Sequence, residues 1–150
     1  MSRRKPVNQM SLKLESRSVN ESFARVAVSA FAAQQDPTVE EISDIKTAVS
    51  EAVTNAIVHG YPEGFGRVVM KLRIKEGNIL EIVVRDWGVG IADVEQARRP
   101  MFTTGNDERS GMGFTIMESF MDRLTVKSAP GKGTTVSMRK RIAPRLSGRR

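Results

Sequence analysis

The stretch of sequence that decides the fold covers residues 50–61 and reads SEAVTNAIVHGY. It lies in a segment whose apolar residues recur at helical spacing, which predicts an amphipathic helix. Glu51, Asn55 and His59, the single histidine of the chain, stand four residues apart. Their side chains therefore form one ridge along the helix. Such a ridge is either a solvated face or a binding site, and the rest of the sequence has to distinguish the two.

Two helices are predicted before residue 61. Ser18 with Glu21, and Thr38 with Glu41, form capping-box patterns that indicate helix starts, and the breaker at 36–37 separates the two helices. The second helix is expected to end near residue 60. The apolar residues that recur at helical spacing in the first helix, and that we expect to be buried, are Phe23, Val26, Ala27, Ala30 and Phe31.

Strands are predicted before and after these helices. Alternating polar and apolar residues, or β-rich runs, mark them at residues 10–14, 68–75, 79–85, 124–127 and 134–138. A long glycine-punctuated stretch over 86–111 precedes a third helix that begins near Gly113. The order β, α, α, β, β, loop, α, β, β predicts an α+β two-layer sandwich, in which helices cover one face of a mixed, mostly antiparallel sheet.

Composition favours one domain in a reducing compartment. The 150 residues are 39% hydrophobic and contain no cysteine. We expect a folded domain over 10–141, a basic arm over 1–9 and a basic tail over 142–150. Neither an export signal nor a membrane span is found, which predicts a cytoplasmic protein. The net charge of +7 is concentrated in the two ends, so we interpret them as solubilising segments and expect no direct contact with nucleic acid.

Three glycine motifs follow the ridge in the chain. Asp86-Trp87-Gly88-Val89-Gly90 follows a strand, Gly111-Met112-Gly113 opens a helix, and Gly131-Lys132-Gly133-Thr134 joins two strands. A buried acid beside glycines can bind a flat ligand, and glycines before a helix expose N–H groups to phosphate. Asparagine and glutamate on a facing helix suit Mg²⁺ and a nucleophilic hydroxyl. Together these motifs predict a nucleotide pocket, although the sequence has neither a P-loop nor the eukaryotic kinase signature.

In this order, the four motifs resemble the N, G1, G2 and G3 boxes of the GHKL superfamily, whose members share the Bergerat ATP-binding fold. More narrowly, the stretches NESFARVAVSAF, SEAVTNAIVHGY, VRDWGVGIAD, MFTTGNDERSGMGFTIMESFMD and KGTTV are similar to the family of SpoIIAB-like anti-sigma factors, which are serine kinases. The resemblance covers residues 10–140. It implies binding of ATP or ADP with Mg²⁺ and phosphoryl transfer to a protein serine.

The resemblance also implies a role for each motif residue. Asp86 would accept a hydrogen bond from the adenine amino group, Asn55 would ligate Mg²⁺, and Glu51 would be the base or orienting group for the incoming hydroxyl. Gly88 and Gly90 would give the base room, Gly111 and Gly113 would shape a lid in which Arg109 contacts phosphate, and Thr134 would close the pocket floor. For His59 we expect a structural role near the helix end.

The expected partners also come from the resemblance. They are the sporulation sigma factor F, which the protein would inhibit, the anti-anti-sigma factor SpoIIAA as serine substrate, and a second copy in a homodimer. Arg25 would lie at the surface shared by both protein partners. Three alternatives remain: a related partner-switching kinase for another sigma factor, a nucleotide-gated binding module without kinase activity, and a nucleic-acid binder acting through its basic tails.

Overall fold

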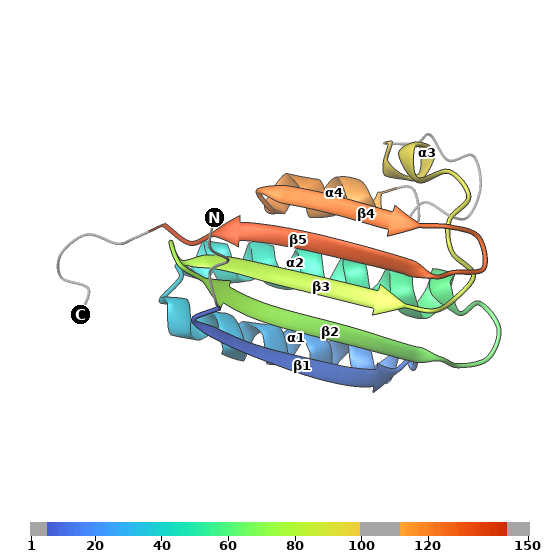
Figure 1. The fold of residues 1–150 in the computed structure, drawn as a ribbon. Coiled ribbons are helices and arrows are strands. Elements are labelled where there is room, and N and C mark those ends of the chain that lie inside the picture. The colour runs from blue at the N-terminus through green and yellow to red at the C-terminus, as the bar shows by residue number, and fades with distance from the viewer. Residues whose placement is uncertain (1–5, 100–111, 144–150) are drawn as a thin grey trace.

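The computed structural model describes residues 6–99 and 112–143, which form two layers (Figure 1). A five-stranded sheet forms one layer, and α1, α2 and α4 cover one of its faces. The elements in chain order are β1 (Asn8–Glu15), α1 (Val19–Ala32), the 3-10 turn η1 (Ala33–Gln35), α2 (Val39–Thr54), the π-helix η2 (Asn55–Gly60), β2 (Arg67–Lys75), β3 (Ile79–Asp86), α3 (Val94–Arg98), α4 (Gly113–Phe120), β4 (Arg123–Ser128) and β5 (Thr134–Arg141).

The strand order in the sheet is β1-β2-β3-β5-β4, and all four pairings are antiparallel. The two-layer α+β sandwich expected from the sequence is confirmed. The described strands include no parallel pair, however, so the sheet is antiparallel throughout and not mixed. None of the helices in residues 6–99 and 112–143 has the length and apolar character that a membrane span requires.

The core lies between the sheet and the central helix α2. Alternate residues of β2, such as Met70 and Leu72, are fully buried against the helices, as the period of a strand requires. From α2, Val49 and Val53 meet them and are also fully buried. Burying each of these side chains contributes about 1.5–3 kcal/mol, so α2 and its continuation η2 are firmly held above the sheet.

The two long helices differ at their N-termini, because α2 begins with a capping box and α1 does not. At the start of α2, Thr38 Oγ1 accepts from the Glu41 N–H at 3.0 Å, and Glu41 Oε1 accepts from the Thr38 N–H at 2.8 Å, which confirms this capping box. The capping box expected at Ser18 is wrong. Ser18 has helical backbone angles and its side chain makes no capping bond, while Glu21 pairs with Arg25 at 3.4 Å.

The buried face of α1 agrees with the expected one at Phe31, which is 7% exposed, but differs from it earlier in the helix. Phe23 and Val26 are 55% and 62% exposed, whereas Ala24 and Val28 are fully buried. The helix carries two apolar stripes, and its sequence does not say which one meets the sheet. The stripe with Ala24, Val28 and Phe31 faces inward, where α1 packs against α2, and this leaves the stripe with Phe23 and Val26 exposed.

The folded unit also extends beyond the expected boundaries. The Val7 N–H donates to the Ile74 carbonyl at 2.7 Å and β1 begins at Asn8, although both residues had been placed in the arm. Ile142, assigned to the tail, is fully buried and its N–H donates to the Asn78 carbonyl at 3.0 Å. A further element, α3, lies in the stretch expected to be a loop. Asp93 caps it by accepting from the Gln96 N–H at 3.0 Å.

Candidate nucleotide site

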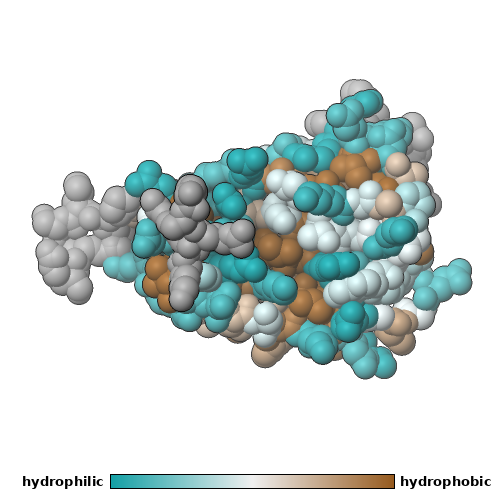
Figure 2. Space-filling model, viewed as in Figure 1, coloured by the Kyte–Doolittle hydropathy of each residue, from teal (hydrophilic) through white to brown (hydrophobic). Residues whose placement is uncertain are grey.

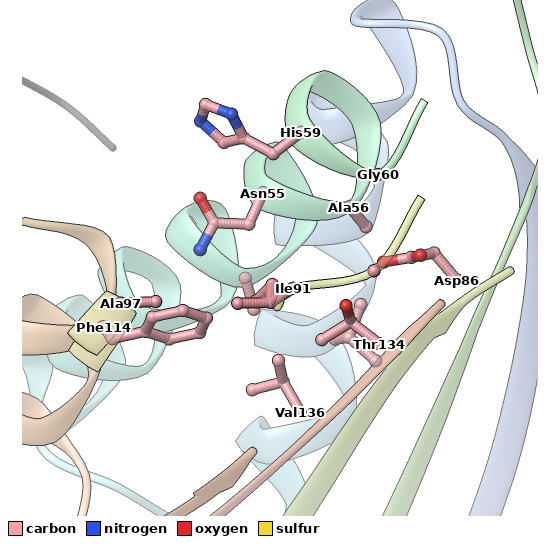
Figure 3. Close-up of a pocket in the computed structure, with 13 residues that line it drawn as sticks. Asn55, Ala56, His59, Gly60, Asp86, Ile91, Ala97, Phe114, Thr134 and Val136 are labelled. Carbon is pink, nitrogen blue, oxygen red and sulfur yellow. The ribbon is translucent and has the colours of Figure 1, made fainter. Parts of the chain in front are cut away.

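The candidate site lies where α2 changes from an α-helix to the π-helix η2, which begins at Asn55. Such π-helical turns occur frequently at functional sites. Below this turn is a cavity of about 160 Å³ (Figure 3). The residues that line it come from α2, η2, β3, β5, α3, α4 and the loop after β3: Ala52, Asn55, Ala56, His59, Gly60, Val84, Asp86, Gly90, Ile91, Ala97, Phe114, Thr134 and Val136.

Asp86 is the one acidic residue among the described residues that line the cavity. It ends β3 and is only 4% exposed. Burial raises the pKa of its carboxyl, and hydrogen bonds from the backbone of Gly88 and Thr134 oppose that rise only in part. The Gly88 N–H donates to Oδ1 at 2.9 Å. The carboxylate is therefore a buried acceptor in a mostly apolar cavity, which suits an amino group on a flat ring.

The loop after Asp86 is fixed to the end of η2. The Val89 N–H donates to the Gly60 carbonyl at 2.9 Å. A side chain on Gly88 would collide with that same carbonyl, and one on Gly90, where φ is +78°, would collide with the Ala129 carbonyl. Both glycines are thus required by backbone packing. That they also leave room for a base stays a prediction.

Thr134 lies on the same side of the cavity as Asp86 (Figure 3). Figure 3 shows Asp86 and Thr134 on one side, with Asn55 and His59 across from them. The Thr134 hydroxyl lies 2.7 Å from Ser128 Oγ, which also accepts from the Ile91 N–H at 2.8 Å. These bonds join the β4–β5 turn to the loop after β3 and hold the Thr134 side chain at the cavity.

Glu51 and Asn55 meet at the start of α4. A Cβ atom on Gly113 would lie 3.2 Å from Asn55 Nδ2 and 3.4 Å from Glu51 Oε1. A side chain at Gly113 would therefore crowd the Asn55 amide by a few tenths of an ångström, while its contact with Glu51 would be ordinary. Asn55 faces the cavity, whereas Glu51 lines a neighbouring hollow of about 330 Å³. The structure thus places Glu51 at the boundary between two adjoining spaces.

The donor set at this site fits magnesium only in a limited way. The described residues include no group of three histidine, cysteine, aspartate or glutamate side chains that could hold a metal ion. Asn55 contributes one amide oxygen, and Glu51 is near it. Mg²⁺ is commonly held by one or two protein oxygens together with phosphates and water. The residues present therefore fit a Mg²⁺ ion that arrives with a phosphate ligand.

Two predicted site residues and one predicted contact remain to be placed. Arg109 and Gly111 lie outside the described residues. Arg25 is on α1, where it pairs with Glu21 and contacts Ser22 Oγ at 3.4 Å. Arg25 also lines the hollow that contains Glu51, so the structure brings the expected partner-binding residue and the expected catalytic residue to the same hollow.

Sequence reasoning missed part of the cavity lining. His59 is exposed and lines the cavity, so the structure places it at the candidate site, and its structural role stays a prediction. Its place on the ridge with Asn55 was a signal for this position. Ile91, Ala97 and Phe114 form an apolar wall, and no local pattern marked them. They meet because α4, which lies further along the chain, packs against α3.

Residues 13–140 match the family described as Histidine kinase-like ATPase domain. Relatives named anti-sigma F factor match almost the whole chain. The protein from Geobacillus thermodenitrificans (strain NG80-2) is 56% identical over 137 residues, which are 91% of this chain and 94% of the relative. The protein from Thermoanaerobacter sp. (strain X514) is 59% identical over 136 residues, which are 90% and 94% of the two chains.

Solved structures share the fold. The crystal structure of the RsbU and RsbW domains of Rv1364c from Mycobacterium tuberculosis matches 94% of this chain and 34% of its own, with a TM-score of 0.67 and 19% identity. The blue-light activated histidine kinase EL346 from Erythrobacter litoralis matches 71% of this chain and 32% of its own, with a TM-score of 0.55 and 26% identity.

Proposed function

This chain belongs to the histidine kinase-like ATPase domain family and, within it, to the anti-sigma factors, and on that premise we propose that it is an ATP-dependent protein serine kinase that also inhibits a sigma factor. The observation that carries the proposal is the arrangement of Asp86, Asn55 and Glu51 around the start of α4 and the adjoining cavity. The relatives named anti-sigma F factor favour sigma factor F as the inhibited protein and the cytoplasm as the place of action.

The cavity supports binding of the adenine ring. Its apolar wall can pack against a flat base, and the buried Asp86 carboxylate can accept from the exocyclic amino group. Guanine carries a carbonyl at that position and would place an acceptor against a carboxylate. We therefore propose that the site takes ATP and ADP and discriminates against guanine nucleotides.

The phosphates would extend from the cavity towards α4 and Asn55. Mg²⁺ bound by the Asn55 amide oxygen and the phosphates would neutralise charge during transfer. Glu51 would accept the proton of the serine hydroxyl while the serine oxygen forms a bond to the γ-phosphorus. The bond between that phosphorus and the β–γ bridging oxygen would break, which releases ADP. The position of Glu51 beside the second hollow supports this role, because the acceptor serine has to approach from outside.

The surface around that hollow supports partner binding. Arg25 and Lys46 line it together with Glu51. Beside it, α1 exposes Phe23 and Val26, and exposed apolar residues of this size often mark interfaces. We propose that this side of the molecule binds the sigma factor and the anti-anti-sigma substrate, SpoIIAA in the expected system, and that the apolar stripe of α1 contributes to a homodimer.

The test compares Glu51→Gln with Glu40→Gln. Both residues are acids of α2, and Glu40 lies in its first turn, far from the cavity. Each variant and the unchanged protein receive labelled ATP, Mg²⁺ and a candidate acceptor protein. We expect Glu51→Gln to lose phosphoryl transfer at least about a hundredfold while its affinity for ADP changes little. The Glu40→Gln variant should transfer at the unchanged rate.

Transfer by Glu51→Gln at the normal rate would exclude Glu51 as the base. A second outcome concerns the unchanged protein: nucleotide-dependent binding of a sigma factor with no transfer would instead support a binding module without kinase activity. Transfer to an acceptor other than SpoIIAA would support a related partner-switching kinase. A protein that binds no nucleotide would overturn the whole proposal.

A further inference from the structure

The face of the sheet that the helices leave uncovered is strongly basic. Figure 2 views this face and shows hydrophilic side chains spread over it, with hydrophobic residues between them. Of the strand residues that point away from the helices, two are acidic, Glu15 and Glu81. Ten are basic: Lys13, Arg67, Lys71, Arg73, Lys75, Arg85, Arg123, Lys127, Arg139 and Arg141.

The helical layer has the opposite charge. The acidic residues of α1 and α2 outnumber their two basic residues, Arg25 and Lys46, and are Glu21, Glu40, Glu41, Asp44 and Glu51. The folded body is nearly neutral as a whole because the charges of its two faces offset each other. A charge count along the sequence therefore missed this separation, which arises only when alternate strand residues reach one surface.

Most of these basic groups are available for a ligand. Glu81 pairs with Arg73 at 3.1 Å, Lys75 at 3.4 Å and Arg139 at 3.1 Å. The other seven basic residues of the face have no carboxylate within ion-pair distance among the described residues: Lys13, Arg67, Lys71, Arg85, Arg123, Lys127 and Arg141.

A groove on this face has the chemistry of a phosphate site. It has a volume of about 330 Å³, runs along β4 and β5, and includes in its lining the Glu81 carboxylate, which pairs with Arg139. Its lining alternates basic groups with hydroxyl groups, namely Arg123, Lys127 and Arg139 with Thr125, Thr135 and Ser137. Arginine, lysine, serine and threonine are among the side chains that contact the phosphates of nucleic acids.

Aromatic rings lie at one end of the same sheet. The ring of Trp87, which is 38% exposed, has the Arg67 guanidinium 4.0 Å and the Arg85 guanidinium 4.6 Å from its centroid. Phe65 is 63% exposed and has Arg17 at 4.2 Å. Proteins that bind single strands combine a basic groove with aromatic rings and arginines on which bases stack.

We propose that the open face of the sheet binds single-stranded nucleic acid, with phosphates along the cations of β2, β4 and β5 and a base against Trp87. An acidic protein segment would be attracted by the same charges. An acidic protein segment has no bases that could stack on the exposed Trp87 and Phe65 rings and their arginines. The observations therefore favour nucleic acid. This proposal differs from the tail-mediated binding considered above, and it does not depend on kinase activity.

The experiment measures the affinity of the full chain for a fluorescent oligothymidylate and an oligouridylate of about 16 nucleotides, a length that one such site can cover. The face variant is Lys71→Gln/Arg123→Gln/Lys127→Gln. The matched control, Arg145→Gln/Arg149→Gln/Arg150→Gln, removes the same charge from the tail. We expect the face variant to lose about tenfold or more in affinity at low salt, and to lower the slope of log K against log salt by about 2. The control should stay near the unchanged protein.

Three further readouts decide the outcome. Trp87 is the only tryptophan of the chain, so stacking of a base should quench its fluorescence, and polyglutamate of equal charge should not displace the oligonucleotide. Unchanged ADP binding shows that the face variant is folded, and the single substitutions are measured in case it is not. Loss of affinity in the tail control but not in the face variant, an unaltered Trp87 signal, or displacement by polyglutamate would each overturn the proposal.

Discussion

The buried carboxyl group of Asp86 should make nucleotide binding depend on pH. Burial raises its pKa above the ordinary value of 3.8, and the deprotonated form is the stronger acceptor for an adenine amino group because its hydrogen bond is charge-assisted. We therefore predict that affinity for ADP falls as the pH is lowered through this raised pKa, at a higher pH than for an exposed aspartate. Isothermal titration calorimetry at a series of acidic pH values measures the affinity for ADP. The Asp86→Asn variant should bind weakly with little pH dependence; if the unchanged protein shows a flat profile, the carboxylate does not bind the base.

Tyr61 holds the backbone next to Asp86. Its hydroxyl donates to the Arg67 carbonyl at 2.7 Å and accepts from the Trp87 N–H at 2.7 Å. We predict that Tyr61→Phe weakens ADP binding by about 1–2 kcal/mol, or roughly tenfold, because the Trp87 N–H loses its acceptor. Phe65→Leu, a change of an exposed ring in the same loop, is the control for affinity. Equal affinities of both variants would mean that Tyr61 does not position the site.

At the scale of single elements, the two apolar stripes of α1 should differ in how much they contribute to stability. We expect Val28→Ala to lower the free energy of unfolding by roughly 1.5–3 kcal/mol, since Val28 is fully buried. Val26→Ala, the same change on the exposed stripe, should alter it by less than about 0.5 kcal/mol. Urea unfolding of both variants at a concentration that keeps the protein monomeric measures the difference. Equal losses would show that both stripes are covered.

The two helices explain how much of the fold was predictable. The stripe of α2 was correctly predicted because its apolar residues form one face with polar residues around it. In α1, two apolar stripes compete, and only the closeness of α2 selects the stripe with Ala24 and Val28. Strands were predictable from alternation, whereas α3 was missed because a helix of five residues has too few turns to show a period.

The site was predictable to the extent that its chemistry is local in sequence. Motif residues such as Asn55, Asp86 and Thr134 were identified, and the structure places all three in the lining of one cavity. The apolar wall was not predicted, because Ile91 and Phe114 look like any core residues until their segments meet. The π-helical turn of η2 was not predicted either, since residues 55–60 have an unremarkable helical composition.

For the whole molecule, Glu81 is central to the open face of the sheet. Burial acts to raise the pKa of its carboxyl, but Lys75 and Arg139 outweigh that effect and the pKa lies below the ordinary 4.5. The ionised group therefore stabilises the fold above its ordinary pKa, and this stability is lost as pH falls through the lowered pKa. We predict that Glu81→Gln lowers the free energy of unfolding by roughly 1–3 kcal/mol at neutral pH.

Thermal unfolding at a series of pH values tests this prediction. The difference between Glu81→Gln and the unchanged protein should shrink as the solution is acidified, because protonated Glu81 no longer attracts its cations. Glu63→Gln, a change of an exposed glutamate in the loop before β2, provides the comparison for a general charge effect. A difference that is independent of pH would mean that packing, and not charge, accounts for the effect of Glu81.

The glycine junctions around the cavity have a consequence for how the protein is made. Gly88 packs on Gly60, Gly90 on Ala129, and Gly133 on the backbone of Asp86, so each junction joins segments that lie far apart along the chain. A nascent chain that lacks β5 has no complete cavity, and nucleotide can stabilise only the finished fold. At a nucleotide concentration one hundred times the dissociation constant this stabilisation is about 2.7 kcal/mol. Cellular ATP would therefore lower the unfolded population of the finished protein and slow its degradation.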